Sequence, residues 1–441
     1  MKFPEIKTKL PGPKGAALIN IDQDHVSPSY TRDYPLIAEK ALGLWITDPD
    51  DNTFLDFTSG IAVCATGHCH PKVVAAIKHQ ADNLLHMSGT DFYYTPQIAL
   101  AKRLADLAPG DGSRKVYFGN SGAEAVEAAF KLARWYTKRE LNIAFFGAFH
   151  GRTMGALSLT ASKVIQKKHY NPLIPGITHI PYAYCYRCPY HMSYPKCGIE
   201  CVRWVEDGLF RTTMPPEEVA AIFVEPIQGE GGYIVPPPEF HKELHKVAQK
   251  YGILYVADEV QAGMGRTGKM FAMEHFCVAP DIMALAKGIA SGMPLGAMVA
   301  KSDIMVWEAG SHASTFGGNP VSCSAALATL DLLKSELMEN ARNQGEYLMG
   351  KLLEMQKTFE CIGDVRGKGL MVGIELVRDR ETKERASEWR NEAIQKAFRK
   401  GLLLLGCGEN TIRFCPALTV TKEEIDVCLS IIEEVLPKCR W

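Results

Sequence analysis

Residues 252–290 read GILYVADEVQAGMGRTGKMFAMEHFCVAPDIMALAKGIA. Two short apolar runs, ILYVA at 253–257 and IMALA at 282–286, lie near the ends of this stretch, with a Gly-rich segment between them. Such runs are typical of strands that are buried in a parallel sheet. Asp258 follows the first run and Lys287 follows the second. The stretch therefore predicts two strands that end at a carboxylate and an amine, at the sheet edge where open α/β folds place ligands.

The same pattern continues on the N-terminal side of this stretch. KVYFGN (115–120), NIAFFGAF (142–149) and AAIFVEPI (220–227) are further apolar runs, separated by helical or Gly/Pro-rich segments. Ser121 and Glu124 form a capping-box pattern, which begins a helix directly after the first of these runs. The alternation predicts an α/β domain with a mostly parallel central sheet.

The two ends of the chain have different patterns. LWITDPDDNTFLDF (44–57) predicts a hairpin around a polar turn, whereas the segment up to about Leu36 has no sustained period and predicts an irregular arm. A long helical pattern covers about 319–357. A strand pattern at 365–377, two further apolar runs and a capping box at Thr421 follow it, and together they predict a smaller α+β unit.

The composition narrows the class of protein. The 441 residues include 49 Lys and Arg against 50 Asp and Glu, with 22% charged and 46% hydrophobic residues. This balance excludes a basic nucleic-acid binder and a disordered acidic chain. The N-terminus shows no apolar signal region and no stretch is apolar enough for a bilayer, so we expect neither export nor a membrane partner. Thirteen cysteines at irregular spacing favour a reducing compartment, and we expect a cytoplasmic location.

The segment GMGRTGKM at Gly263–Met270 resembles two phosphate-binding loops. It neither directly follows a strand nor opens a helix, and Met270 stands where a nucleotide loop needs a hydroxyl group. A Gly-rich turn is therefore the favoured interpretation. A nicotinamide-dependent oxidoreductase that uses this loop is an alternative from another class of enzyme.

Two features of the sequence suit a phosphate-binding site and a reactive lysine. Residues 121–123 are small and begin a helix, which leaves backbone N–H groups open to a phosphate, although a plain helix cap fits them too. Lys287 has small or apolar neighbours, and desolvation lowers the pKa of an amine, as a Schiff-base lysine requires. A lysine whose stem packs at a strand end is the ordinary alternative.

Further polar residues end or interrupt apolar strands. Phe149, His150 and Arg152 offer a ring, an imidazole and a guanidinium in one turn, which an ordinary strand end could also carry. Glu230 lies in a Gly-rich loop a few residues after Glu225. Arg413 lies inside the apolar strand TIRFCPAL, where a buried arginine needs a carboxylate partner from the protein or a substrate.

Eight blocks occur in order along nearly the whole chain. They are FLDFTSGIAVCATGHCHP, NSGAEAVEAAFKLAR, AFHGRTMGALSLT, VEPIQGEGGY, ADEVQAGMGRTGK, LAKGIASGMPLGA, STFGGNP and VRGKGLMVGIEL. Together they resemble one known family, the class III aminotransferases, which depend on pyridoxal phosphate. The resemblance implies a fold-type I transferase with a large cofactor-binding domain at 61–334 and a small α+β domain at 335–441, to which the arm and hairpin at 1–60 also belong. It also implies a homodimer with shared active sites, and leaves open a higher oligomer.

By this resemblance, Lys287 carries the cofactor and moves the proton between the substrate carbon and the cofactor carbon. Asp258 would face the pyridine nitrogen and keep it protonated, and Phe149 would stack on the ring. The remaining cofactor contacts would come from Ser121, Gly122, Ala123, His150, Glu225, Val260 and Gln261, and from Thr315 of the partner subunit.

Four residues resemble the family's substrate contacts. Arg152 is similar to the residue that binds the distal carboxylate of 2-oxoglutarate or 4-aminobutyrate. Glu230 and Arg413 resemble a switch pair, in which Glu230 neutralises Arg413 and swings aside for an α-carboxylate. Ile61 and the GEGG loop resemble enzymes that move an amino group from an ω-amine or amino acid, such as 4-aminobutyrate, to 2-oxoglutarate by a ping-pong mechanism. Ornithine- or acetylornithine-type aminotransferases and broad-specificity amino-acid racemases are the alternatives.

An insertion at 182–204 departs from the family's common pattern. Cys185, Cys188, Cys197 and Cys201 form C-x2-C-x8-C-x3-C there. These spacings suit a tetrahedral zinc site that His191 could help to close, but two disulfides or four reduced thiols fit as well. A non-enzymatic zinc-binding module is the alternative that this motif adds.

Overall fold

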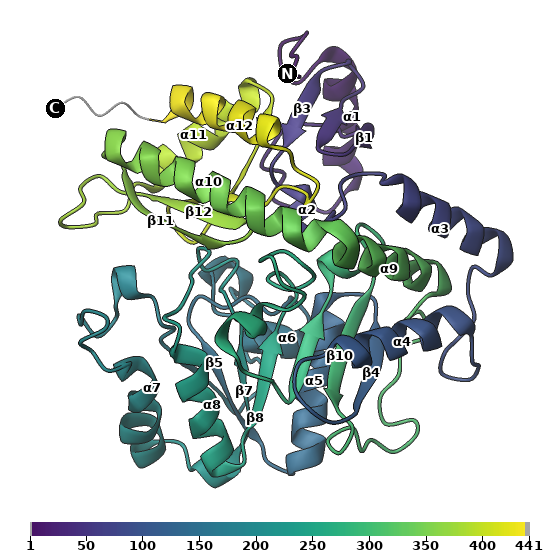
Figure 1. The fold of residues 1–441 in the computed structure, drawn as a ribbon, viewed down its shortest axis with the longest axis vertical. Coiled ribbons are helices and arrows are strands. Elements are labelled where there is room, and N and C mark those ends of the chain that lie inside the picture. The colour runs from purple at the N-terminus through teal and green to yellow at the C-terminus, as the bar shows by residue number, and fades with distance from the viewer. Residues whose placement is uncertain (1, 437–441) are drawn as a thin grey trace.

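The computed structural model describes residues 2–436, and a seven-stranded sheet forms its centre (Figure 1). The strands span Arg114–Gly119 (β4), Leu141–Phe145 (β5), Ile177–Ile180 (β6), Val219–Val224 (β7), Leu254–Asp258 (β8), Ile282–Leu285 (β9) and Gly296–Lys301 (β10). They lie in the order β4-β10-β9-β8-β7-β5-β6. All neighbours pair in parallel except β10, which is antiparallel to both β4 and β9. The expected α/β class is therefore confirmed, with a sheet that is mixed.

Both faces of this sheet are buried. Helix α5 (Gly122–Thr137) packs against β4, β7, β8, β9 and β10 and buries Val126 and Phe130. Alternate residues of β7 belong to different hydrophobic clusters, since Phe223 packs under α5 and Val224 packs on the opposite side. This double burial explains why the strands have continuous apolar sequences. Between residues 59 and 251, the other α-helices are α2 (Ser59–Ala62), α3 (Pro71–Asn83), α4 (Thr95–Leu107), α6 (Met154–Leu159), α7 (Glu200–Trp204) and α8 (Phe240–Tyr251).

Elements from both ends of the chain lie together above this sheet in Figure 1. The expected hairpin is present, because β2 (Trp45–Thr47) and β3 (Thr53–Asp56) pair antiparallel, and β3 also pairs in parallel with β13 (Leu402–Leu403). β1 adjoins β2, and a further sheet has the order β11-β12-β15-β14. These strands span Lys40–Leu42 (β1), Ile362–Lys368 (β11), Met371–Leu376 (β12), Leu405–Cys407 (β14) and Thr411–Phe414 (β15). Residue 1 and residues 437–441, which the predicted domain bounds include, lie outside the described residues.

The C-terminal helices follow the predicted patterns closely. Helix α9 (Pro320–Leu332) continues through a π-helical turn into α10 (Met338–Thr358), which matches the long helical pattern. Helix α11 covers Ser387–Arg399. Helix α12 (Lys422–Val435) begins at a complete capping box, in which Thr421 and Glu424 each bond the other's backbone N–H.

The prediction of an irregular arm at the N-terminus is wrong in one respect, because this segment contains helix α1 (Pro13–His25). The side chain of Asp50 accepts hydrogen bonds from the backbone N–H groups of Lys14 (3.1 Å) and Gly15 (2.9 Å). Pro13 at the first helical position is the one start signal within the segment, and the side-chain cap comes from a distant part of the chain.

The single strand pattern at 365–377 is a hairpin in the structure. β11 and β12 pair antiparallel and turn at Gly369, whose φ is +52°. A Cβ at Gly369 would lie 2.5 Å from the carbonyl carbon of Thr267. Both the left-handed backbone and the close approach require glycine, so the turn is specified by tertiary packing.

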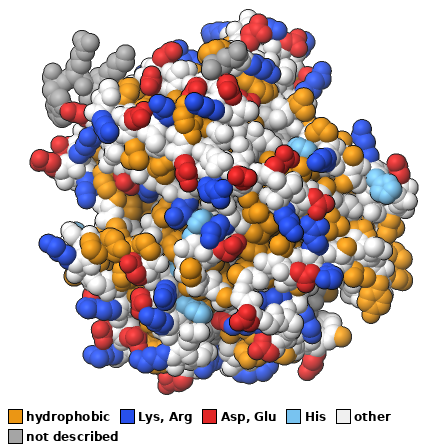
Figure 2. Space-filling model, in the orientation of Figure 1, with side chains coloured by type: hydrophobic (Ala, Val, Ile, Leu, Met, Phe, Trp, Pro, Cys, Tyr) orange, Lys and Arg blue, Asp and Glu red, His pale blue; other side chains and the backbone are white. Residues whose placement is uncertain are grey.

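Surface charge and hydrophobicity follow the composition. On the face shown in Figure 2, basic and acidic side chains are interspersed, and hydrophobic side chains gather toward the right-hand edge, where Figure 1 places α3 and α4. Leu85, Phe92 and Tyr93, which lie between these helices, are 64%, 51% and 94% exposed. Within residues 2–436, no helix combines the length and the apolar composition needed to cross a membrane.

Candidate active site

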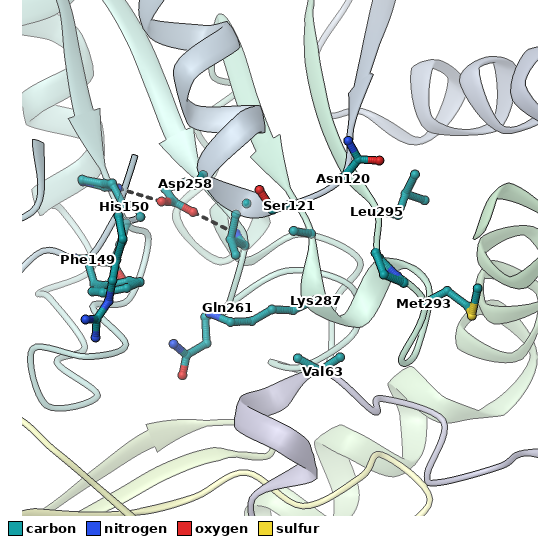
Figure 3. Close-up of a pocket in the computed structure, with 18 of the residues that line it drawn as sticks. Val63, Asn120, Ser121, Phe149, His150, Asp258, Gln261, Lys287, Met293 and Leu295 are labelled. Atoms are coloured by element: carbon teal, nitrogen blue, oxygen red, sulfur yellow. Dashed lines mark hydrogen bonds and ion pairs between the residues drawn. The ribbon is translucent and has the colours of Figure 1, made fainter. Parts of the chain in front are cut away.

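A pocket of about 420 Å³ lies at the C-terminal ends of β8 and β9, beside the start of α5 (Figure 3). This is the size of a site for a small molecule. It brings together most of the residues that the sequence singles out. Its lining consists of Val63, Asn120, Ser121, Gly122, Ala123, Phe149, His150, Gly151, Arg152, Glu225, Asp258, Val260, Gln261, Ala286, Lys287, Gly292, Met293, Pro294 and Leu295.

Asp258 and His150 form a buried pair on one side of the pocket (Figure 3). Oδ2 of Asp258 lies 2.7 Å from Nδ1 of His150, and Oδ1 accepts a hydrogen bond from the backbone N–H of Val260 at 3.0 Å. Burial lowers the pKa of His150, but the hydrogen bond and charge of Asp258 outweigh it, so the pKa is raised overall. Nε2 of His150 is buried without a hydrogen-bond partner among the described residues. The histidine therefore presents one satisfied and one unsatisfied nitrogen.

Lys287 lies two residues after the end of β9 and begins a short 3-10 turn, with a φ of +47°. Figure 3 shows its side chain between Asp258 and Val63. Burial lowers the pKa of Lys287, and the attraction of Asp258 only partly offsets this. A lysine with a lowered pKa is more often the neutral amine, which is the nucleophilic form.

The start of α5 forms a narrow cradle at the pocket. The hydroxyl of Ser121 accepts a hydrogen bond from the backbone N–H of Glu124 at 3.2 Å, which is one half of the expected capping box. A Cβ at Gly122 would lie 2.9 Å from Cγ1 of Val260, and a Cβ at Gly151 would lie 2.7 Å from that of Ala123. Glycines here allow close backbone approach, and the positive end of the helix favours an anion.

Glu225 links two segments that border the pocket. Its Oε1 accepts from the backbone N–H of Phe149 at 3.0 Å, and its Oε2 accepts from that of Gly229 at 2.8 Å. Burial raises the pKa of Glu225 to about 7. The hydroxyl of Tyr182, at the start of the insertion, donates to the backbone carbonyl of Glu225 at 3.0 Å. The insertion therefore contacts the wall of the pocket.

Glu230 and Arg413 form the ion pair that the family resemblance implies. Oε2 of Glu230 lies 3.2 Å from Nη1 of Arg413, and Oε1 lies 2.6 Å from Nζ of Lys163. Burial raises the pKa of Glu230, but the two cations outweigh it and hold the pKa below its ordinary value. Burial lowers the pKa of Arg413, but the charge of Glu230 outweighs it and raises the pKa overall. Both groups are therefore charged, and both influence the pKa of Lys287.

Three predicted site residues are exposed. Arg152 lines the pocket with its guanidinium 5.8 Å from the centre of the Phe149 ring. Ile61 is 45% exposed and has a φ of +69°, and Val63, two residues later, lines the pocket in its place. Thr315 is exposed and is absent from the pocket lining of this chain.

Sequence patterns do not single out several residues that shape the site. Lys163 reaches Glu230 across 67 positions, and Tyr233 donates to Oε1 of Gln261 at 3.0 Å. Met293 and the residues after it line the pocket from the charge-free run before β10. The absence of charges from that run is a sequence signal for a segment that packs against the fold. The contacts of Lys163 and Tyr233 have no such signal, because they depend on tertiary structure.

The Gly-rich segment at 263–270 is a turn, as expected, and lies outside the pocket. Arg266 within it is 2% exposed and donates to the backbone carbonyls of Leu370 (3.1 Å) and Pro416 (2.5 Å). Its side chain therefore binds the C-terminal part of the fold, which is a structural task.

The four cysteines of the insertion are free thiols that line one small cavity of about 20 Å³. Burial, with a further contribution from the neighbouring thiols, raises the pKa of Cys185 to about 11 and that of Cys201 to about 12. Among residues 2–436, no three or more His, Cys, Asp or Glu side chains are grouped so that they could hold a metal ion. The thiols thus lie near one another without forming disulfides.

Known proteins match this chain over nearly its whole length. Residues 26–436 match the family described as Aminotransferase class-III. An alanine/serine racemase of Pyrococcus horikoshii is 41% identical, over 99% of this chain and 93% of its own. An acetylornithine aminotransferase of Caldanaerobacter subterraneus subsp. tengcongensis is 40% identical over 96% and 100%, and a probable 4-aminobutyrate aminotransferase of Bacillus subtilis is 38% identical over 90% and 92%.

A solved structure extends the likeness to three dimensions. An amine transaminase from an uncultivated Pseudomonas species, in its pyridoxal-phosphate-bound form, is similar with a TM-score of 0.86 at 30% identity, covering 100% of each chain. The fold and the pocket thus define a pyridoxal-phosphate-dependent enzyme of fold-type I. More narrowly, the chain belongs to the class III aminotransferase family. The expected fold class, enzyme class and cofactor are confirmed.

Proposed function

We propose that this enzyme transfers the amino group of an ω-amine or amino acid, of which 4-aminobutyrate is the model, to 2-oxoglutarate in two half-reactions that share one pocket. The observation that carries this proposal is the ion pair of Glu230 and Arg413, which lies outside the pocket lining but whose charges act on the pKa of Lys287. While Arg413 is neutralised by Glu230, the pocket suits an amine without an α-carboxylate. When Glu230 moves away, Arg413 can bind the α-carboxylate of glutamate.

The residues of the pocket fit pyridoxal phosphate. The cradle of Gly122 and Gly151 at the positive end of α5 suits the phosphate, and the carboxylate of Asp258, hydrogen-bonded to His150, suits the protonated ring nitrogen. Phe149 would stack on the ring. The other proposed contacts are Ser121, Ala123, Glu225, Val260 and Gln261. When bound, the cofactor supplies an aldehyde that reacts with amines and a ring that accepts the electrons released at the substrate carbon.

The protein's own groups would move and hold the protons. Lys287 has a lowered pKa, so its Nζ can act as a nucleophile and, once free, can take the proton from the substrate carbon and return it. His150 would keep its proton on Nδ1, because the Asp258 carboxylate accepts a hydrogen bond there. This hydrogen bond fixes the orientation of the Asp258 side chain at the back of the site.

Arg152 would bind the distal carboxylate of the substrate. It is exposed at the rim of the pocket, and its guanidinium lies near the ring of Phe149, which limits its orientations. Ile61 would contact the carbon chain between the two ends of the substrate. Together with Arg413, this gives one cation for each carboxylate of glutamate.

We infer that the working enzyme is a homodimer. Tyr93 and Phe316 are 94% and 61% exposed in the single chain, and large exposed apolar residues of this kind mark interfaces. Thr315 precedes Phe316 and would reach the cofactor phosphate of the neighbouring subunit. Light scattering should give twice the mass of the chain, and a monomer with full activity would contradict this assembly.

A racemase is the second candidate, because the alanine/serine racemase of P. horikoshii is 41% identical over 99% of this chain. The two activities separate in one assay. Incubation of L-alanine or L-serine without any oxo acid, followed by chiral chromatography, yields the D-enantiomer only if the enzyme racemises. Racemisation at a rate above that of amino transfer would favour this candidate.

Two experiments test the main proposal. Borohydride reduction of the holoenzyme, followed by peptide mass mapping, should place the cofactor on Lys287, and a label on another lysine would contradict the assignment. A panel of amines and amino acids with 2-oxoglutarate as acceptor should identify the donor. In Glu230→Ala, the half-reaction with 4-aminobutyrate should suffer far more than that with glutamate, and equal losses would refute the switch.

A further inference from the structure

Glu230 is held by two cations from different parts of the chain. Its Oε1 lies 2.6 Å from Nζ of Lys163, and its Oε2 lies 3.2 Å from Nη1 of Arg413. Each carboxylate oxygen therefore has a cationic partner of its own. The family motifs concern Arg413, whereas Lys163 lies in the segment between α6 and β6.

The two partners differ in their access to solvent. The side chain of Arg413 is 5% exposed, that of Lys163 is 43% exposed, and that of Glu230 is 17% exposed. A buried guanidinium needs a carboxylate partner at all times, whereas a partly hydrated ammonium does not. Arg413 can therefore release Glu230 only when another carboxylate replaces it. Lys163 can stay paired with Glu230 throughout this exchange.

The backbone of Glu230 is held by a hydrogen bond, and a hollow lies next to the loop that carries it. The backbone carbonyl of Glu230 accepts a hydrogen bond from the N–H of Gly408 at 2.7 Å. Beside this contact lies a hollow of about 360 Å³, whose lining includes Ser162, Gly231 and Gly408. Ser162 and Gly231 directly adjoin the two paired residues in the sequence. Open space thus adjoins both the segment of Lys163 and the loop of Glu230.

We propose that Lys163 is a positioning residue that determines specificity, because it keeps Glu230 paired when the α-carboxylate of a substrate takes its place on Arg413. This inference rests on the proposed function. A donor without an α-carboxylate leaves the pair of Glu230 and Arg413 intact and makes no demand on Lys163. An α-amino acid requires the exchange, so Lys163 favours amines that carry an α-carboxylate.

The test compares two half-reactions of the holoenzyme, with 4-aminobutyrate and with L-glutamate, by stopped-flow absorbance. In Lys163→Met, we expect the ratio of the second-order rate constants, glutamate over 4-aminobutyrate, to fall about fivefold, as for the loss of one partly exposed ion pair. Lys163→Arg keeps the cation and should restore the ratio. Lys168→Met removes an exposed charge from the same segment and is the matched control.

Two outcomes would overturn the inference. Equal losses in both half-reactions would indicate a general structural role for Lys163. A change in the ratio that persists in a Glu230→Ala background would exclude action through Glu230, because a double-mutant cycle should then show no coupling. Failure of the proposed function gives a different result, in which the wild-type enzyme accepts neither 4-aminobutyrate nor L-glutamate. In that case the best α-amino acid and the best amine without an α-carboxylate from the donor panel replace the two substrates in the same comparison.

Discussion

Glu259, next to Asp258, should make the stability of the enzyme depend on pH. Its side chain is completely buried, and its oxygens accept hydrogen bonds from the backbone N–H groups of Ala272 (2.9 Å) and Met273 (2.8 Å). Burial raises its pKa from the ordinary 4.5 to about 8, although the two N–H groups act in the opposite direction. Because the folded state holds this proton more tightly than the unfolded chain, the contribution of Glu259 favours folding most below pH 4.5. This contribution decreases as the pH rises toward about 8.

The size of the effect follows from the same two pKa values. At about 1.4 kcal/mol per pH unit between them, the contribution of Glu259 to the free energy of unfolding changes by at most about 5 kcal/mol. Glu259→Gln removes this titration. The glutamine also places its NH2 group against one of the two backbone N–H groups, which lowers the free energy of unfolding by about 1–3 kcal/mol because that N–H loses its acceptor. We therefore expect the variant to be less stable than the wild type at pH 5 and to recover relative to it as the pH rises.

The assay is denaturant unfolding of the holoenzyme at pH 5, 6.5 and 8, at one protein concentration, because dimer dissociation also affects the midpoint. The measured quantity is the difference in midpoint between the variant and the wild type. Glu274→Gln is the matched control, since Glu274 also accepts a backbone N–H, from Phe271 at 2.8 Å, but is only partly buried. If the difference for Glu259→Gln stays the same at all three pH values, the buried carboxyl does not titrate in this range and the reasoning is refuted.

Three further predictions concern the pocket and the insertion. In Gly122→Val, the side chain collides with Val260, so the affinity of the apoenzyme for pyridoxal phosphate, measured by absorbance titration, should fall at least about tenfold; unchanged affinity would argue against the cradle. In His150→Leu, Asp258 loses a buried hydrogen-bond donor, so kcat should fall about 30-fold while the cofactor stays bound, and full activity would refute the role of the pair. Cys201, with a pKa of about 12, should react slowly with iodoacetamide at pH 8 compared with an exposed thiol, as mass spectrometry can measure, and rapid labelling would contradict its burial.

The parts of the fold that depend on neighbouring residues could be predicted from the sequence. The strands that lead to Asp258 and Lys287 are recognisable because their short apolar runs are continuous, as in strands that are buried on both faces. The helix after Thr421 is recognisable because its capping box lies within four residues. The Gly-rich segment at 263–270 could be rejected as a nucleotide loop because Met270 cannot bind magnesium.

The parts that depend on distant residues could not be predicted. Helix α1 is capped by Asp50, and the turn at Gly369 is set by its close approach to Thr267, so the local signals, Pro13 and a single glycine, are too weak to predict either feature alone. The antiparallel direction of β10 is likewise a property of the whole sheet, which a single apolar run does not reveal. Within the site, the motifs indicate Glu230 and its partner Arg413, but a second cation 67 positions away can be found only from the structure.

The insertion and the loop of Glu230 are joined through one buried carboxylate, Glu375, which is 0% exposed. Arg187 from the insertion binds its Oε1 at 2.5 Å, and Arg366 binds its Oε2 at 2.8 Å. Arg366 also donates to the backbone carbonyl of Gly232, two residues after Glu230, at 2.6 Å. Removing one charge from such a buried network leaves another without its partner, so the three groups hold one another in place. The loop of Glu230, where we propose that the substrate binds, thus depends on charges outside the pocket, which the motifs that identify the family do not include.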